Sequence, residues 1–291
     1  MTVRQPASPT LCRLQLGNEL RQIRLRKGLT STQVVKKLIW SPSKLTRLET
    51  GENATVEPAD VMALCQIYEV DEETAKQLEQ YAAVTKTKRD WWQSPEYRPV
   101  IGPGPKAIHG LESSAASLHA YNSEWVPGLF QTPEYIRTLH RHSHGHSSEE
   151  DIECMVELRQ KRQKVLRQEV PLKFAVVVNE AVLLRQVGGR VVMKAQLARM
   201  IEEASAPNID LQVVPFKAGH YRAMNGPFTI IRFREESAVK PIVYLENLAD
   251  HWVLRRSPDV EMYEEAFNEL RALAPGPQES LNLITKAMKE L

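Results

Sequence analysis

The strongest constraint on the fold is a series of short helices with clearly marked ends in residues 14–51. The first, residues 14–27, repeats apolar residues at helical spacing and stops at Gly28, a residue type that often ends helices. The second begins after Thr30, and Gln33 completes a capping box in which each side chain satisfies the other residue's backbone N–H. The sequence therefore predicts separate short helices here.

A third predicted helix follows at once. Ser41 is its N-cap, Pro42 occupies the first helical position, where a missing N–H is no loss, and Gly51 ends it. Only about three residues separate the second helix from the third, so the two must cross sharply. This is the helix-turn-helix arrangement, which sets a short helix into the major groove of DNA.

Charge is unevenly distributed along this part of the chain. Residues 1–50 contain ten Lys or Arg and only two acids, Glu19 and Glu49, whereas residues 51–85 contain eight acids and a single Lys76. The whole chain has a net charge of only +2, which excludes a protein that is basic throughout. One basic end and one acidic end favour a polyanion that binds on one side.

The third predicted helix has a polar face suited to DNA. Leu45 and Leu48 face the core, and the polar residues between them face outward with donors for base edges and phosphates. The alternative is an ordinary three-helix bundle in which this face is only solvated. The residues predicted to bind double-stranded DNA are Ser31, Thr32, Gln33, Ser41, Ser43, Lys44, Thr46, Arg47 and Thr50.

Residues 16–70 resemble a Cro/repressor-type (XRE-type) helix-turn-helix domain, and the run WSPSKLTRLETG from Trp40 is similar to its recognition helix. The sequence departs from that pattern at Ile39, because such domains usually carry Gly in the turn. The roles that the resemblance implies are base reading for Ser43 and Arg47, positions near the DNA backbone for Ser31, Lys44 and Thr50, and an internal polar bond for Glu49.

The composition divides the chain into two domains and a linker. Residues 86–106 contain Trp91-Trp92 and then four prolines and two glycines between Pro95 and Pro105, which cannot sustain a helix or a central strand. The predicted parts are an all-α domain of five helices in residues 1–85, a Trp/Pro-rich linker in residues 86–106 and a second domain in residues 107–291.

The second domain is predicted to be mixed α/β, which makes the whole chain α+β. Runs of β-branched and aromatic residues predict a small sheet of about four strands over residues 172–178, 209–216, 228–233 and 242–246. Helical patterns predict helices over residues 111–121, 132–142, 147–168, 190–206, 258–273 and 277–291.

Several motifs of this domain resemble the C-terminal domain of the WhiJ-like, Scr-type regulators of actinobacteria. They are LESSAASLHAYNSEWVPGLFQTPEYIR from Leu111, ELRQKRQKVL from Glu157, FAVVVNEAVLLRQVGG from Phe174, IDLQVVPFKAGHYRAMNGPFTIIRF from Ile209 and VYLENL from Val243. The resemblance covers nearly everything from Trp91 onward. It implies an antitoxin-like transcription regulator, often encoded beside a small partner protein.

Three carboxylates of the second domain would allow a catalytic alternative. Glu180 and Glu246 follow apolar strands and Glu112 lies on a preceding helix, so a carboxylate pair could serve acid/base hydrolysis. The sequence shows no nucleophile elbow, phosphate loop or zinc motif. Carboxylates that hold loops through backbone N–H groups are the simpler explanation, so we expect no enzyme activity and no cofactor.

A histidine run raises the question of a metal site. His140, His142, His144 and His146 alternate along the chain, a spacing that could give two metal ligands from one extended segment. No Cys or distant His signature accompanies the run, and such runs are mostly polar loops. We therefore expect no metal.

An aromatic group beside the Pro127-Gly128 turn is a candidate surface for a small-molecule effector or a partner protein. It consists of Trp125, Phe130 and Tyr135, although aromatic residues at this spacing are usually core.

The chain lacks an apolar stretch of the length that a membrane helix needs, and residues 1–15 lack the order of a signal peptide. Cys12, Cys65 and Cys154 stand far apart with no CxxC pair, as expected for reduced thiols. These features predict a cytoplasmic protein without a membrane partner.

Together the sequence predicts a transcriptional regulator that binds a near-palindromic operator as a homodimer through residues 1–85. Residues 107–291 would supply dimerisation and the response to a partner or effector. The alternative function is a small-molecule receptor or hydrolase-like enzyme whose second domain carries the main activity. The sequence does not specify the operator, the sign of regulation, the effector or the dimer interface.

Overall fold

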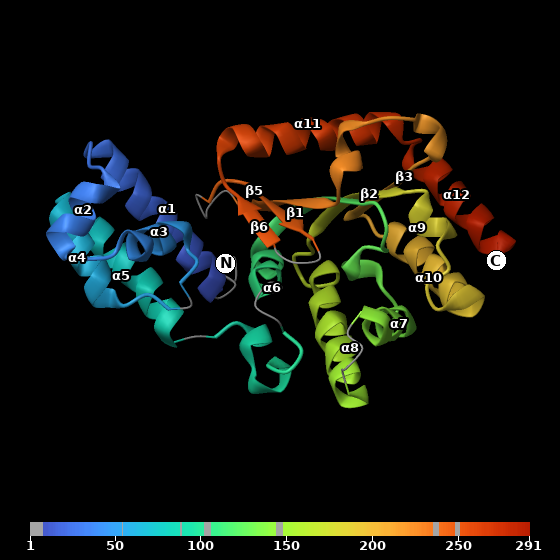
Figure 1. Ribbon diagram of the computed structural model, residues 1–291, viewed down its shortest axis with the longest axis horizontal. Coiled ribbons are helices and arrows are strands. Elements are labelled where there is room, and N and C mark those ends of the chain that lie inside the picture. Colours follow the sequence, from blue (N-terminus) through green and yellow to red (C-terminus); the bar gives the residue numbers. More distant parts are fainter. Residues whose placement is uncertain are drawn as a thin grey trace. The chain divides into compact units, whose positions relative to one another are not determined.

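The computed structural model describes residues 8–53, 55–87, 89–101, 106–143, 148–234, 239–247 and 251–291. The chain divides into two compact units, Met1–Ser94 with Arg234–Val239, and Pro95–Phe233 with Lys240–Leu291 (Figure 1). The predicted linker is divided between them: η1 (Trp91–Gln93) belongs to the first unit and η2 (Pro95–Tyr97) to the second.

Within its described residues, the first unit contains five α-helices, the number that the sequence predicts. They are α1 (Pro9–Arg26), α2 (Ser31–Leu38), α3 (Pro42–Thr50), α4 (Pro58–Tyr68) and α5 (Glu72–Thr87). The predicted start of α1 is five residues too late. Its N-cap is Ser8, whose side chain accepts a hydrogen bond from the Leu11 N–H, and Pro9 occupies the first turn.

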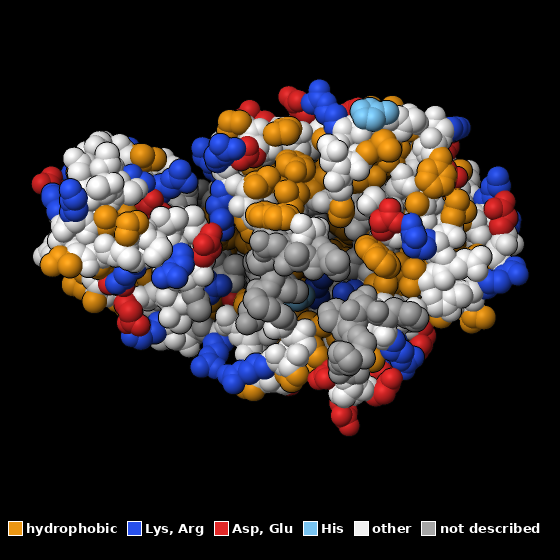
Figure 2. Space-filling view, in the orientation of Figure 1, with side chains coloured by type: hydrophobic (Ala, Val, Ile, Leu, Met, Phe, Trp, Pro, Cys, Tyr) orange, Lys and Arg blue, Asp and Glu red, His pale blue; other side chains and the backbone are white. Residues whose placement is uncertain are grey.

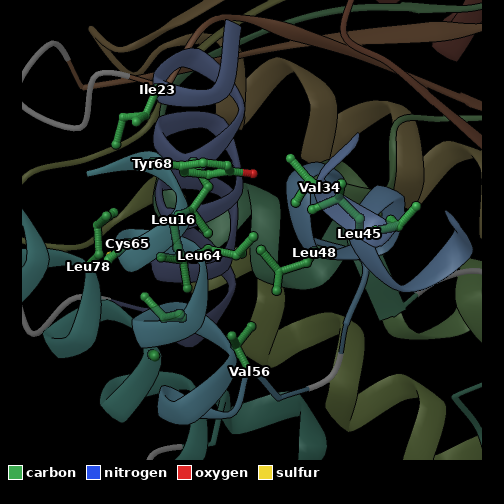
Figure 3. Close-up of a cluster of buried hydrophobic side chains, with 14 residues drawn as sticks. Leu16, Ile23, Val34, Leu45, Leu48, Val56, Leu64, Cys65, Tyr68 and Leu78 are labelled. Atoms are coloured by element: carbon green, nitrogen blue, oxygen red, sulfur yellow. The ribbon is translucent and has the colours of Figure 1, made fainter. Parts of the chain in front are cut away.

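The five helices share one apolar core (Figure 3). Val34 of α2 and Leu48 of α3 lie in it together with Leu64 of α4. Helices α1 and α3 approach closely at Gly17, where an added Cβ would lie 2.5 Å from the Leu48 carbonyl oxygen. The core therefore fixes α3 through its buried face and leaves its other face outside.

The second unit is built on a six-stranded sheet in the order β3-β2-β1-β4-β5-β6. Its first three strands are parallel to one another, and β4, β5 and β6 are antiparallel to their neighbours. In the register of the centre, Leu118 pairs with Phe174 on one side and with Ile231 on the other. The strands are β1 (Ala115–Asn122), β2 (Lys173–Asn179), β3 (Ile209–Val214), β4 (Phe228–Phe233), β5 (Ile242–Glu246) and β6 (His251–Leu254).

Helices cover both faces of this sheet. Helix α11 (Ser257–Leu273) lies along one face and contacts β1, β3, β4 and β5 (Figure 1). The other face carries α6 (Lys106–Ser114), α7 (Pro133–Ser143), α8 (Glu149–Gln163) and α10 (Gly189–Ala204). The two remaining helices are α9 (Ala181–Leu184), which packs on β2, and α12 (Pro277–Glu290), which packs on β3. The predicted α+β class is confirmed.

Two strands differ from the prediction. Residues 111–121 were expected to be helical, but α6 ends at Ser114 and residues 115–122 form β1 between two partner strands. The Ala-rich composition favours helix locally, and pairing on both sides outweighs that weak preference. The edge strand β6 was not predicted, because its four residues are too few to show a pattern.

No helix in the described part of the chain is long and apolar enough to cross a membrane. All three cysteines are free thiols: Cys12 and Cys65 are buried and Cys154 is half-buried.

Candidate nucleic-acid interface

The turn between α2 and α3 keeps helix-turn-helix geometry despite its bulky residues. Ile39 ends α2 in the left-handed conformation, with φ 54° and ψ 41°, a region that β-branched residues rarely adopt. Trp40 follows and packs partly against the apolar core. Ile39 thus adopts the left-handed conformation that Gly usually adopts at this turn, and its backbone is strained as a result.

The structure brings the predicted DNA-binding residues together at the starts of α2 and α3 and along α3. Two of them, Lys44 and Thr50, are half-buried. The exposed members are Ser31, Thr32, Gln33, Ser41, Ser43, Thr46 and Arg47.

Several of these polar groups already bond within the helices. The Gln33 Oε1 atom accepts from the Thr30 N–H at 2.8 Å, and Thr30 Oγ1 accepts from the Gln33 N–H at 3.2 Å, which confirms the predicted capping box. Ser41 Oγ accepts from the Lys44 N–H as the predicted N-cap. Thr46 Oγ1 donates to the Pro42 carbonyl at 3.0 Å. These groups support the helices, and they can still accept bonds from a partner.

Lys44 is not free in solvent, contrary to the expectation for an outward residue. Its Nζ lies 2.8 Å from Asp60 Oδ1 of α4 and 4.0 Å from the centre of the Trp40 ring. The Asp60 carboxylate and the Trp40 ring already interact with the ammonium group of Lys44, which weakens its attraction for a phosphate. The predicted phosphate contact would therefore require Lys44 to exchange its partner.

Arg47 differs from Lys44. It lies one turn after Ser43 and is exposed, and its guanidinium forms no hydrogen bond or ion pair with the described residues. A free planar fork on the exposed face of the second helix of a helix-turn-helix matches the acceptor pair O6 and N7 of guanine.

Glu49 makes the internal bond that the resemblance implies. Its two carboxylate oxygens accept from Nε and Nη2 of Arg24 at 2.6 and 2.8 Å, and the side chains are only 7% and 8% exposed. Arg24 also donates to the Leu29 carbonyl at 2.9 Å. This pair ties α1 to both α3 and the start of α2.

The count of basic residues in the sequence therefore overstates the charge available to DNA. Arg24 is buried against Glu49, and Arg13 is buried within 3.9 Å of Asp90. Lys36 and Lys37, in the last turn of α2, are exposed and were missing from the predicted interface. Their position just before the turn could have indicated this role, since Lys and Arg side chains are common in the last turn of a helix and often contact DNA phosphates.

The strained turn gives a stability prediction. We expect Ile39→Gly to raise the free energy of unfolding of the first unit by about 1 kcal/mol, because glycine removes a strain of about 1–2 kcal/mol at the cost of a more flexible unfolded chain. The Ile39 side chain is 94% exposed, so little burial is lost. Calorimetry of the full chain measures the change. Ile39→Ala is the control, since it keeps the Cβ; equal stability of the two variants would contradict the strain.

The structure does not bring the three aromatic candidates of the second unit to one surface. Phe130 and Tyr135 are buried, whereas Trp125 is about half-exposed. Tyr135 Oη accepts from the Val126 N–H at 3.2 Å, and the Phe130 ring lies 5.2 Å from that of Phe174. Phe130 and Tyr135 are therefore core residues, as aromatic residues at this spacing usually are.

Family comparisons agree with this division of the chain. The family described as "Helix-turn-helix domain" matches residues 15–78, which include α2, α3 and the turn between them. The family described as "Domain of unknown function (DUF5753)" matches residues 106–286, more than half of the chain. The chain belongs to the DUF5753 family. No curated protein and no solved structure matches it.

Two of the three carboxylates that a catalytic alternative would use have structural partners in the DUF5753 domain. Glu180 accepts a hydrogen bond from the Phe216 N–H at 2.7 Å, the loop-holding role that the sequence suggests. Glu112 is buried and binds Arg162, and Glu246 is exposed at the end of β5.

The histidine run lies only partly in the described structure. His140 of α7 is buried, whereas His144 and His146 lie outside the described residues. Among the residues that are described, no three His, Cys, Asp or Glu side chains come together as metal ligands.

Proposed function

We propose that this member of the DUF5753 family is a sequence-specific transcriptional regulator that binds a near-palindromic operator as a homodimer. On this proposal α3 enters the major groove and the DUF5753 domain supplies dimerisation and the response to a partner protein or effector. An antitoxin-like role beside a small partner protein is supported by the resemblance of the second unit to WhiJ-like regulators.

One observation carries the proposal. In a helix-turn-helix domain, the exposed face of the second helix presents Arg47, whose guanidinium no described residue engages. The same helix carries exposed hydroxyl groups, and α2 carries the exposed Lys36 and Lys37. A single short helix reads few base pairs, so selection of a genomic site favours a two-fold pair of domains.

On this proposal the protein catalyses no reaction. Two of the three candidate carboxylates are engaged, Glu112 by Arg162 and Glu180 by a backbone N–H. A hydrogen bond or ion pair to a carboxylate stabilises its ionised form and so makes it a weaker general base.

The experiment is a retardation assay of the full chain on the upstream DNA of its own gene, without added ligand. We expect a discrete retarded band that unlabelled upstream DNA displaces and a scrambled duplex of equal length does not. Equal displacement by both duplexes would contradict sequence-specific binding.

Salt dependence gives a second prediction. Because Lys36, Lys37 and Arg47 are exposed and lack charged partners among the described residues, we expect log affinity to fall linearly with log salt, with a slope of about −0.9 for each phosphate contacted. Fluorescence anisotropy on a labelled duplex measures the slope, with chloride replaced by fluoride as the anion control. An affinity that does not change between low and physiological salt would contradict contact with the DNA backbone.

A further inference from the structure

Ionisable side chains converge in the second unit where α6, α8 and the end of β5 meet. Arg162 interacts electrostatically with Glu112, Tyr244 and Glu246, and Arg159 with Arg162 and Glu246, and Figure 2 shows Lys or Arg side chains set back from the surface of the larger unit. We call this place the α6–α8 hollow. Its ionisable residues are His109 and Glu112 of α6, Arg159 and Arg162 of α8, and Tyr244 and Glu246 of β5.

The two arginines of the hollow have different partners. Arg162 binds Glu112 through two hydrogen bonds, one of them 2.6 Å from Nη2 to Oε1. Glu112 is 4% exposed and Arg162 is 17% exposed. A bidentate pair of this kind neutralises both charges, so neither side chain needs a further ion.

Arg159 has only a neutral partner. Its Nη1 donates to Oε1 of Gln131, and within the described part of the chain its guanidinium forms no other hydrogen bond and no ion pair. Gln131 is buried and its amide is held in place, because its Nε2 donates to the Val126 carbonyl at 2.7 Å. The other N–H groups of Arg159 therefore remain available.

The groups around Arg159 do not form an ion pair with it among the described residues. Burial, followed by the positive field of the two arginines, lowers the pKa of His109 to about 3, so its ring is neutral at physiological pH. Burial raises the pKa of Tyr244, which therefore stays a neutral phenol. Burial also lowers the pKa of Arg159 to about 10, with Arg162 as the second cause. Glu246 is exposed and forms no ion pair with Arg159, but its negative charge acts on Arg159 and opposes this lowering of the pKa.

We propose that Arg159 binds the carboxylate group of a small organic acid in the α6–α8 hollow. Arg159 is half-buried and its hydrogen-bond partner is a neutral amide, so an anion that enters the hollow would pair with a guanidinium that has no ion-pair partner among the described residues. The planar fork of arginine matches a carboxylate in two parallel hydrogen bonds. This site goes beyond the proposed DNA-binding function and does not depend on it.

The charges of the hollow favour a monoanion over phosphate. Arg159 is the one guanidinium in it that lacks a carboxylate partner among the described residues, so it offers a single positive charge. The negative charge of Glu246, which acts on Arg159, would repel the second negative charge of a phosphate dianion.

Calorimetric titration of the full chain at constant ionic strength tests the site with acetate, propionate and benzoate as probes. Acetamide, propionamide and benzamide are the neutral controls, and inorganic phosphate is the dianion control. We expect at least one carboxylate to bind about tenfold or more tightly than its own amide and than phosphate. If no carboxylate exceeds its amide, or if phosphate binds most tightly, the proposal is wrong.

Two variants locate the binding. We expect Arg159→Gln to weaken carboxylate binding about tenfold or more, whereas Lys164→Gln, which removes an exposed charge just after α8, leaves it unchanged. Carboxylate binding that survives Arg159→Gln would place the ligand elsewhere and overturn the assignment.

A folding control separates loss of binding from loss of structure. Without ligand, Arg159→Gln should keep or raise the Tm, because the charge it removes has no charged partner among the described residues, whereas Arg162→Gln should lower it by leaving Glu112 buried and unpaired. Equal losses of Tm in the two variants would show that Arg159 serves the fold instead.

Discussion

Replacement of Arg24 by Met should destabilise the first unit by about 3–5 kcal/mol, because the change leaves the Glu49 carboxylate buried without its cation. The two side chains are 8% and 7% exposed and share two short hydrogen bonds, so solvent cannot take over the role of Arg24. Calorimetry of the full chain should show the transition of this unit at a lower temperature, with the transition of the DUF5753 domain unchanged.

A double variant is the control for Arg24→Met. Arg24→Met combined with Glu49→Leu removes both charges and should recover most of the lost stability, since an apolar pair of similar volume often replaces a buried ion pair without loss. A single variant that loses less than about 1 kcal/mol, a value typical of exposed pairs, would contradict the burial of this pair.

Arg47→Ala should weaken binding to the preferred DNA site by about 1–3 kcal/mol, or roughly 5- to 150-fold. It should also remove the preference at one base pair of each half-site, because the guanidinium can bond O6 and N7 of a single guanine. Titration of duplexes with every single base change, for the original protein and for the variant, measures both effects.

Arg26→Ala is the matched control for Arg47→Ala, because it removes the same charge from an exposed position on α1. We expect Arg26→Ala either to leave DNA binding unchanged or to weaken binding to all DNA sequences by the same factor. The fold should tolerate Arg47→Ala, since the side chain is exposed and alanine favours helix. If Arg47→Ala keeps the full base preference, the face of α3 that reads bases is not the one that carries Arg47.

The sequence was most informative where structure depends on local signals. The capping box of Thr30 and Gln33 and the N-cap at Ser41 depend on atoms a few residues apart, and both caps form as predicted. By contrast, β1 depends on pairing with β2 and β4, which lie about fifty and a hundred residues further along the chain. Its Ala-rich sequence carries no local sign of that pairing.

The sequence predicted where the residues of the DNA interface lie better than it predicted which of their charges are free to contact DNA. The sequence placed Arg47 and Lys44 on one outward face, but it could not show that Lys44 meets Asp60 or that Arg24 is buried against Glu49. Helix packing brings these partners together. A count of charges along the chain does not show this, because it treats every Lys and Arg side chain as equally available to DNA. The same limit applies to Arg159, whose importance depends on having Gln131 beside it rather than a carboxylate.

Selection of randomised duplexes by the full chain at physiological salt tests the central proposal most directly. We expect the selected DNA to contain two half-sites related by two-fold symmetry, about 10 base pairs or a small multiple of that apart, because two copies of α3 would enter successive major grooves on one side of the duplex. Selected DNA without a shared sequence, or a single half-site bound by a monomer, would contradict the account.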